Sequence, residues 1–378
     1  MIRLITSDDD FKALEWRWNN LLGRSEADTI FLRWEWLFTW WNLFGKTLGQ
    51  LSIFVVEEEG EIIGIAPCYI KSERYLPFFT TRTLRFLGTG EDEENEIDSE
   101  YLCMISADGK EEEIVRLVFD HVVSHRLCDA IRLSKMSMDL KTTGMISTYC
   151  AQRGVSCHLQ RTTEVSFIQL SGSWEGYLAG LTSAMRYEIR SDRRKLLKHG
   201  EVSFRCTNSV DDIETDFEEM SWLHRVHWMA NGKPGVFANP LFSLFHKTMM
   251  PLLLKNGALQ LGFLSLAGKN IGVGYLFLHH NKFIFYQTGF DRSSAPNVSV
   301  GLVTISYCIE RAIQLKCTEY DFLGGGHLYK KRLANQTRWM GEVYIPLRPI
   351  TRYLFRIRNA AQKMRDPFKA QDGTRPTA

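Results

Sequence analysis

A short apolar stretch that runs into three glycines is the part of this sequence best suited to hold reacting groups. Residues 320–323 have the composition of a strand, and glycines 324–326 follow directly. A strand that ends in glycines has no side chains to fill the space beside it, so a ligand or another backbone segment comes close there. Asp321 lies in this strand and is placed to accept a proton from an amine, directly or through water. Its alternative role is that of a turn aspartate bonded to nearby backbone, and the sequence favours neither role.

A predicted helix start upstream offers a site for anions. Leu302, Ile305, Ile309 and Ile313 recur at helical spacing, which predicts an amphipathic helix that begins near Ser299. The first turn of a helix has unpaired N–H groups, and these bind anions such as pyrophosphate. Gly301 would let a ligand approach the backbone. The residues from which we expect contacts with a phosphate-bearing donor are Asn297, Val298, Ser299, Val300, Gly301 and Leu302.

A basic helical segment is a second source of phosphate contacts. Residues 186–198 contain six Lys and Arg residues, and Ser183 is placed to cap a helix start just before them. A basic face of this kind is usually only solvated. Arg is also well suited to bidentate contacts with phosphate, and we expect such contacts from Arg190 and Arg194.

Histidines and an acidic run complete the polar groups that could take part in chemistry. His224 and His227 form an H-x-x-H pattern, but no thiolate or carboxylate set completes a zinc site, so we expect no metal. His224 ranks behind Asp321 as a catalytic residue, because a histidine on a helix is more often packed or exposed than a base. Residues 91–100 include seven acidic residues. They form either a solvated loop or a wall that selects a cationic or amine-bearing acceptor.

Two similar hairpins indicate an internal repeat. GEIIGIAPCYI (60–70) and GKNIGVGYLFL (268–278) share a turn glycine, then Ile and Gly at the same offsets, and then an apolar strand. Each is followed by a further strand, a loop, a helix and a closing strand. Two copies of one unit explain 378 residues better than one large domain. We predict an α/β (α+β) fold with a mixed sheet flanked by helices in each of two domains, residues 1–160 and 161–345, and a basic tail at 346–378.

Periodicity also predicts the remaining elements. The expected strands are 51–56, 62–70, 84–87, 101–105, 130–133, 164–170, 259–266, 271–278 and 283–289. The expected helices are 11–22, 108–124, 218–228, 241–254 and the first part of the tail. Segment 31–45 has four tryptophans, Trp34, Trp36, Trp40 and Trp41. We expect them in a core rather than in a ligand-stacking wall, because aromatic density at helical spacing usually packs inside.

The segments YQTGFD (286–291) and YDFLGGGHLYK (320–330), with the small-residue loop between them, resemble the acyltransferase half of the GNAT superfamily. The likeness is to the BioF2-like acetyltransferase domain, a group that includes CelD-type cellulose-biosynthesis proteins and is related to the FemAB peptidyltransferases. It extends over nearly all of residues 1–345. The aromatic segment 31–45 and the basic segment 186–198 fit the same group.

The resemblance implies transfer of an acyl group from acyl-CoA, in the simplest case acetyl-CoA, to an amine. The acceptor would be a small molecule or an envelope or exopolysaccharide precursor, entering between the two halves. By the same likeness Tyr329 donates a proton and Lys330 stabilises negative charge. We expect acceptor contacts from Trp228, Tyr286, Gln287 and Asp98.

One departure from the superfamily keeps two other functions open. The familiar Q/R-x-x-G-x-G/A motif is missing. The donor could therefore be an aminoacyl-tRNA, as in FemAB-like enzymes, or the fold could serve as a non-catalytic binding or scaffold module in envelope or polysaccharide assembly.

Composition favours a cytoplasmic protein. The formal charge is +2, and the eight cysteines form no C-x-x-C pair, as expected of reduced thiols. Asp8, Asp9 and Asp10 stand where a secretory signal would be apolar, and no apolar run approaches the roughly 20 residues of a membrane helix. We expect no DNA partner. The tail after Pro346 has eight Lys and Arg residues against two Asp, so it docks on the body or touches an anionic surface, and its last ten residues are expected to be disordered.

Overall fold

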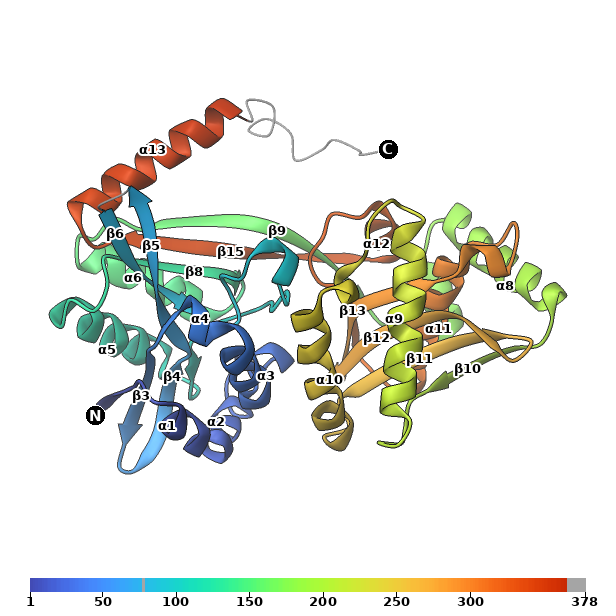
Figure 1. Ribbon diagram of the computed structural model, residues 1–378, viewed down its shortest axis with the longest axis horizontal. Helices are drawn as coiled ribbons and strands as arrows, with labels where there is room; N and C mark the ends of the chain where they lie inside the picture. The colour runs from blue at the N-terminus through green and yellow to red at the C-terminus, as the bar shows by residue number, and fades with distance from the viewer. Residues whose placement is uncertain (77–78, 366–378) are drawn as a thin grey trace. The chain divides into compact units, whose positions relative to one another are not determined.

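The chain folds into two compact units of mixed α/β structure (Figure 1). The computed structural model describes residues 1–76 and 79–365, and side chains for 1–74 and 80–357. Unit 1 comprises Met1–Gly90, Asp98–Thr162 and Trp339–Ala378, and unit 2 comprises Glu91–Ile97 and Thr163–Arg338. Most of the acidic run thus belongs to unit 2 and the tail to unit 1. The last ten residues, expected to be disordered, lie outside the described part of the chain.

Unit 1 has two sheets, with strand orders β1-β3-β4-β7 and β2-β5-β6-β8-β15. Its strands are β1 (Ile2–Ile5), β2 (Gly49–Leu51), β3 (Ile53–Glu58), β4 (Glu61–Ala66), β5 (Cys68–Leu76), β6 (Phe79–Phe86), β7 (Ile105–Ser106) and β8 (Ala130–Ser137). Its helices are α1 (Asp8–Ala13), α2 (Glu15–Leu22), η1 (Ile30–Leu32), α3 (Trp34–Trp40), η2 (Trp41–Gly45), α4 (Lys46–Leu48), α5 (Glu111–Ser124), α6 (Lys141–Gln152) and α13 (Pro349–Arg365).

Strands β9 (His158–Gln169) and β15 (Gln336–Pro346) contribute residues to both units. Unit 2 has one sheet of order β10-β11-β12-β13-β14-β9. Its other strands are β10 (Val202–Cys206), β11 (Leu259–Leu266), β12 (Lys269–His279), β13 (Lys282–Phe290) and β14 (Glu319–Asp321). Its helices are η3 (Glu93–Asn95), α7 (Trp174–Gly180), α8 (Ser183–His199), α9 (Ile213–Met229), η4 (Val236–Ala238), α10 (Pro240–Lys255), η5 (Arg292–Ser294), α11 (Val300–Gln314) and α12 (Leu328–Leu333).

The predicted repeat is visible in the backbone of the two hairpins β3–β4 and β11–β12. Glu59 and Gly60 have φ of 51° and 86°, and Ala267 and Gly268 have φ of 48° and 81°. Positive φ at both central residues is what a type I′ hairpin turn requires. The predicted turn glycines therefore have the same role in both copies.

The two hairpins also share a β-bulge and a site of close helix packing. Pairing skips Ile63 in the first hairpin and Ile271 in the second. At the next residue, Gly64 or Gly272, a Cβ atom would lie 2.3 Å from a side chain of α5 or 2.1 Å from a side chain of α11. The likeness between the units therefore extends to register and helix packing.

The four tryptophans of segment 31–45 are buried, as predicted for a core. Their indole N–H groups are also used: Trp34 donates to the Phe11 carbonyl (2.9 Å), Trp36 to Ser99 Oγ (2.9 Å) and Trp41 to Asp8 Oδ1 (2.7 Å). A buried indole with a bonded N–H contributes apolar area without an unsatisfied donor.

Several local predictions were wrong. The expected strand 62–70 is divided at Pro67 into β4 and β5, which belong to different sheets. The expected helix 11–22 is interrupted at Leu14, which ends α1 and precedes α2. The expected strand 101–105 is reduced to β7, because Asp98 and Tyr101 have φ of 50° and 56° and so interrupt an extended chain. The cap of α8 is Thr182, whose Oγ1 accepts from the Met185 N–H (3.3 Å), rather than Ser183.

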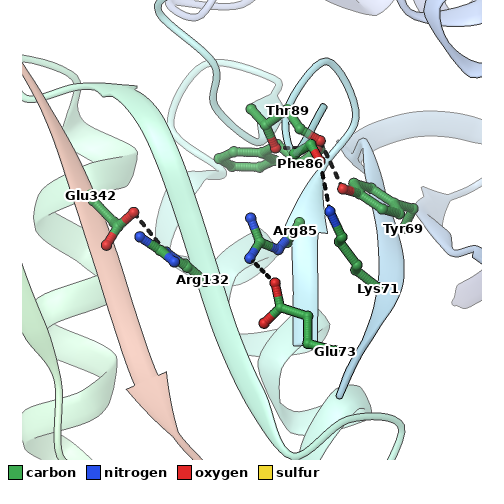
Figure 2. Close-up of polar contacts among 9 residues, drawn as sticks. Tyr69, Lys71, Glu73, Arg85, Phe86, Thr89, Arg132 and Glu342 are labelled. Atoms are coloured by element: carbon green, nitrogen blue, oxygen red, sulfur yellow. Dashed lines mark hydrogen bonds and ion pairs between the residues drawn. The ribbon is translucent and has the colours of Figure 1, made fainter. Parts of the chain in front are cut away.

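A polar network in unit 1 fixes the end of β6 just before the acidic run (Figure 2). Lys71 Nζ donates to the Gly90 carbonyl and Tyr69 Oη to the Thr89 carbonyl, both at 2.7 Å. Figure 2 also shows Arg85 paired with Glu73 on the neighbouring strand. A second ion pair, Arg132 Nε to Glu342 Oε2 at 2.8 Å, joins β8 to β15. Thr89 and Gly90, the last two residues before the acidic run, are thus both held by hydrogen bonds to their carbonyl groups.

Helices cover both faces of the unit 2 sheet. Gly272 pairs with Phe290 and Val273 with Gly289, so these glycines face opposite sides, because consecutive cross-strand pairs alternate between faces. Gly272 lies under α11, and a Cβ on Gly289 would be 2.3 Å from the His224 backbone nitrogen of α9. Figure 1 shows α9 crossing the front of these strands. The α11 face carries a core shared with α8, and its members include Met185, Ile189, Leu276, Phe283, Phe285, Ile305, Ile309, Tyr320 and Phe322.

We expect Gly289→Ala to destabilise unit 2, because the nearest atoms to the new methyl group belong to the α9 backbone and cannot rotate away. The unfolding free energy should fall by about 1–3 kcal/mol, the range for overpacking. Gly180→Ala is the matched control, since a Cβ there meets nothing within 4 Å. Urea denaturation of both variants checks the prediction, and equal midpoints would contradict this packing.

Candidate active site

The strands β13 and β14 run side by side for three residues and then part. They pair in parallel at Lys282–Glu319, Phe283–Tyr320 and Ile284–Asp321. The pairing with β13 ends at Asp321, whereas the chain follows β9 for one more residue, since Phe322 donates its N–H to the Ser166 carbonyl (3.1 Å). Within the described residues, β13 therefore continues to Phe290 without a strand partner on this side. A strand edge of this kind suits an extended ligand.

Asp321 and Tyr286 lie on the face of the sheet covered by α9 and α10. The alternate residues Phe283, Phe285 and Tyr320 belong to the core on the α11 face. Asp321 pairs with Ile284, so both face the other side, and Tyr286 follows two residues later on the open part of β13.

A β-bulge in β13 adds Gln287 to this face. Tyr275 pairs with Gln287 and Leu276 with Phe285, so Tyr286 is the extra residue. The Gln287 side chain interacts with the His224 ring of α9 and favours its protonated form, so Gln287 lies beside that ring. Bulges of this kind re-aim side chains. The bulge therefore presents two successive polar side chains, Tyr286 and Gln287, at the point where the strands part.

Asp321 is buried and its carboxylate is engaged. Oδ1 accepts the Leu323 N–H at 2.7 Å, and Oδ2 lies 3.4 Å from Arg338 Nη2. Leu323 has φ of 56°, a conformation that this bond supports. Arg338 also pairs with Glu319 and lies 4.0 Å over the Phe167 ring. The contacts are those of the turn aspartate considered from the sequence.

Lys330 and Tyr329 have different surroundings from one another. Lys330 is buried, and its Nζ donates to the Phe322 carbonyl (2.8 Å) and to that of Gly324, so it holds the glycine turn by its backbone. Tyr329 packs against the core of the α11 face, its ring 6.4 Å from that of Phe322, and burial raises the pKa of its hydroxyl.

His224 is a buried imidazole whose ring nitrogens have no hydrogen-bond partner in the described structure other than the neighbouring Gln287 side chain. Gly235, Phe237 and Trp228 enclose it: a Cβ on Gly235 would lie 2.8 Å from the ring, and the Phe237 ring is 5.0 Å away. Burial lowers the pKa of His224 to about 4. The imidazole is therefore neutral near pH 7, and one of its ring nitrogens is a donor while the other is an acceptor. His227, one turn later, has its ring 4.0 Å from Phe290.

A second buried histidine supports Tyr286. His246 Nε2 lies 3.2 Å from Tyr286 Oη, and its Nδ1 lies 3.1 Å from Tyr275 Oη. Burial lowers the pKa of His246 to about 3, so the ring is neutral. Tyr286 donates its hydroxyl hydrogen to the Ile97 carbonyl. The phenol is thus fixed between α10 and the acidic run.

The acidic segment Glu91–Ile97 is bound to this side of unit 2 through its backbone. Asn239 accepts from the first N–H groups of α10 and donates Nδ2 to the Glu94 carbonyl and to Asn95 Oδ1, both at 2.9 Å. The carboxylates of Asp92, Glu93 and Glu94 are left exposed. Asp98, also predicted to contact the acceptor, belongs to unit 1, where it pairs with Lys135 (3.1 Å).

The predicted anion site at the start of α11 is partly occupied by a carboxylate of the chain itself. Ser299 donates its N–H to Asp192 Oδ2 of α8 at 3.0 Å. Lys195 bridges Asp192 Oδ1 (2.8 Å) and the Asn297 carbonyl (3.3 Å). Among the described residues, no backbone acceptor bonds the N–H groups of Gly301 and Leu302. The N–H groups of Gly301 and Leu302 therefore remain as donors at the start of α11. The positive end of the helix dipole is partly neutralised by the Asp192 carboxylate at the N-cap residue Ser299.

The other predicted donor-binding residues have mixed surroundings. A Cβ on Gly301 would lie 2.5 Å from the Phe290 ring, so this glycine is required for packing. Asn297 has φ of 62°, which turns the chain into the helix. Arg190 pairs with Glu175 (2.5 Å), and the exposed Arg194 lies one turn further along α8.

Sequence reasoning missed Asp192 and His246, although both left a signal. Asp192 interrupts the buried stripe of α8 formed by Met185, Ile189 and Leu196. His246 lies among the apolar residues of α10. A polar residue at a buried helical position is hydrogen-bonded in most proteins, which marks it for closer inspection.

Comparison with known proteins finds a family model that matches the part of the chain containing this site. The sequence profile described as acetyltransferase (GNAT) domain matches residues 183–331, from the start of α8 into α12. The match confirms the resemblance found in the sequence. No curated protein matches the chain.

Solved structures show the same fold over nearly the whole chain. The crystal structure of FemX has a TM-score of 0.59 at 12% identity, covering 93% of this chain and 99% of FemX. L-PGS from Bacillus licheniformis has a TM-score of 0.52 at 9% identity, with coverages of 93% and 96%. A protein of unknown function from Bacteroides thetaiotaomicron has a TM-score of 0.53 at 10% identity, with coverages of 92% and 100%. At such identities the likeness is one of fold.

His224→Gln should reduce the dependence of stability on pH. The folded protein keeps this ring neutral down to about pH 4, whereas the unfolded chain protonates it near 6.5. The unfolded state therefore binds more protons below about pH 6.5, and stability that is full above this pH is lost as the pH falls. The loss between pH 7.5 and pH 5 should be smaller by about 2 kcal/mol in the variant. Urea titrations at both pH values test this, with the exposed His199→Gln as control; an unchanged pH dependence in His224→Gln would contradict it.

Proposed function

We propose that the GNAT acetyltransferase domain of residues 183–331 transfers an acyl group from acyl-CoA, in the simplest case acetyl-CoA, to an amine. The observation that carries the proposal is the parting of β13 from β14, with Asp321, Tyr286 and Gln287 on one face at that point. The open edge of β13 suits an extended donor such as a pantetheine arm, and α11 begins shortly after the same strand ends. A thioester held along this edge would present its carbonyl to the polar face.

Donor phosphates would bind near the start of α11. The N–H groups of Gly301 and Leu302 are the donors that remain there, and Arg190 and Arg194 of α8 supply positive charge. Helix N-termini and Arg side chains are the usual partners of phosphate. Lys195, already next to Asn297, can contribute a further charge.

The acceptor would approach on the side of the acidic segment. Tyr286 is bonded to the Ile97 carbonyl, so the open edge of β13 and the exposed carboxylates Asp92, Glu93 and Glu94 share one side of unit 2. Carboxylates raise the local concentration of a cationic amine. This supports an amine-bearing small molecule or envelope precursor as acceptor, with Trp228 as a further contact.

Proton transfer requires a group with a free acceptor atom. Asp321 has both oxygens occupied, by the Leu323 N–H and by Arg338. In the part of the chain that the structure describes, His224 has no hydrogen-bond partner for its ring nitrogens other than the Gln287 side chain, so at least one nitrogen is open to a bound group. We therefore assign the amine proton to His224 or to a water bound by it, and assign to Asp321 the positioning of the glycine turn. Lys330 has the same positioning role.

An aminoacyl-tRNA donor is the second candidate. The observation in its favour is that Asp192 already accepts the Ser299 N–H, which leaves less of the helix start for a pyrophosphate. FemX, and the C-terminal domain of an Agrobacterium fabrum protein described as a putative lysylphosphatidylglycerol synthetase, are similar to this chain in fold at low identity. A non-catalytic binding role in envelope or polysaccharide assembly is the third possibility, and it predicts ligand binding without turnover.

Acetyl-CoA should raise the melting temperature of the protein, because a ligand that binds only the native state stabilises it by about 2.7 kcal/mol at one hundred times its Kd. Free CoA and longer acyl-CoAs provide the comparison series. Arg194→Ala should weaken binding roughly tenfold, the effect of one lost charged hydrogen bond. The matched control is Arg225→Ala, which changes an exposed arginine of α9. No shift with any CoA derivative would exclude the acyl-CoA donor.

Asp321→Asn and Asp321→Ala separate positioning from base catalysis. The Asn side chain can still accept the Leu323 N–H, whereas Ala cannot. We expect Asn to keep turnover within about tenfold and Ala to lose both turnover and melting temperature, while His224→Gln lowers kcat roughly 10²–10⁴-fold. Donor affinity should persist in His224→Gln. A loss of this size in Asp321→Asn with an unchanged melting temperature would instead make Asp321 the base.

A further inference from the structure

The last described helix, α13, has a row of exposed apolar side chains. Ile350, Tyr353 and Ile357 are 42%, 62% and 48% exposed. Their spacing of three and then four residues places them on one side of the helix. Leaving three large apolar side chains in water along one stripe is unfavourable unless a partner covers them.

The opposite side of α13 attaches it to unit 1. The Phe355 ring stacks on Tyr344 of β15 at 4.3 Å and lies 4.4 Å from His158 of β9. Thr351 is buried and donates its hydroxyl hydrogen to the Asp129 carbonyl at 3.0 Å. The stripe is therefore held outward by contacts on the other face of the helix.

Positive charge is concentrated on the same helix. The α13 sequence contains five Lys and Arg residues and no Asp or Glu, which leaves 41 basic against 44 acidic residues in the rest of the chain. Arg352 and Arg356 are exposed. Both lie close enough to His158 to contribute, after burial, to a lowered pKa of that ring. These two arginines therefore lie along one edge of the apolar stripe, between it and the attached face of the helix.

We propose that α13 is a membrane-docking helix that binds the surface of an anionic lipid bilayer. Apolar side chains enter the boundary between headgroups and acyl chains while flanking arginines remain at anionic headgroups, the arrangement of interfacial helices. Among the described residues, no helix has the length and hydropathy to span a bilayer. RNA would use the arginines but offers little to an isoleucine and tyrosine stripe, so the observations favour lipid.

The full chain should sediment with vesicles of equimolar phosphatidylglycerol and phosphatidylcholine and only weakly with phosphatidylcholine alone. Arg352→Gln with Arg356→Gln should weaken binding roughly 30-fold, at about 1 kcal/mol per charge. Added salt should weaken it as well, by screening. Tyr353→Ser with Ile357→Ser should also lower the bound fraction strongly, since the apolar contact is lost.

The matched control is Tyr187→Ser, a tyrosine of α8 that is 67% exposed and far from α13 in sequence. It should bind vesicles as the parent chain does. Equal binding to neutral and anionic vesicles, or no effect of the stripe variant, would overturn the proposal. Binding of a single-stranded RNA that depends on the arginines but not on Tyr353 would overturn it in favour of nucleic acid. A dimer seen by light scattering and abolished by Tyr353→Ser would assign the stripe to a second copy of the chain.

Discussion

The close packing of two helices against glycines of β12 and β13 is the constraint on which the rest of unit 2 depends. At Gly272 and Gly289 the nearest helix atoms would lie 2.1 and 2.3 Å from a Cβ. These positions face opposite sides, so α11 and α9 lie directly on the two surfaces of the same strand pair. Strands held between two helices at this distance cannot slide, and the groups at their ends are fixed with them. The polar site is built where that rigid pair meets β14.

Buried hydrogen bonds and ion pairs fix the chain where β14 ends, after its third residue pair with β13. Arg338 joins the carboxylates of β14, and Lys330 holds two carbonyls of the glycine turn. Ionic groups in such places add little net stability, because desolvation offsets their attraction, but removing one partner leaves a buried charge. Their effect is on geometry: Leu323 is kept at positive φ and the chain continues along β9. The open edge of β13 is a product of these contacts.

Local patterns predicted most of the elements and the repeat, while contacts between distant residues were not predictable. Gly60 and Gly268 predict their hairpins because these turn positions have a positive φ, which glycine adopts more readily than other residues. The start of α11 at Ser299 follows from periodicity. The role of Asp321 stayed open because it depends on Arg338, and the partner of Ser299 could not be inferred because Asp192 is 107 residues away. No local pattern encodes such pairings.

The carboxylate of Asp192 has a consequence for donor choice. A helix start that already holds one negative charge binds a second anion less well, since its macrodipole is partly neutralised and like charges repel at short range. Lys195 contacts both Asp192 and the Asn297 carbonyl, so it adds one positive charge at the start of α11. The pair is therefore close to neutral, and affinity for a donor phosphate must come from the two remaining N–H groups and the arginines of α8. Because the Asp192 side chain already accepts a hydrogen bond at the start of α11, this helix start needs no bound ligand to stabilise it. The folding of α11 is therefore independent of the donor.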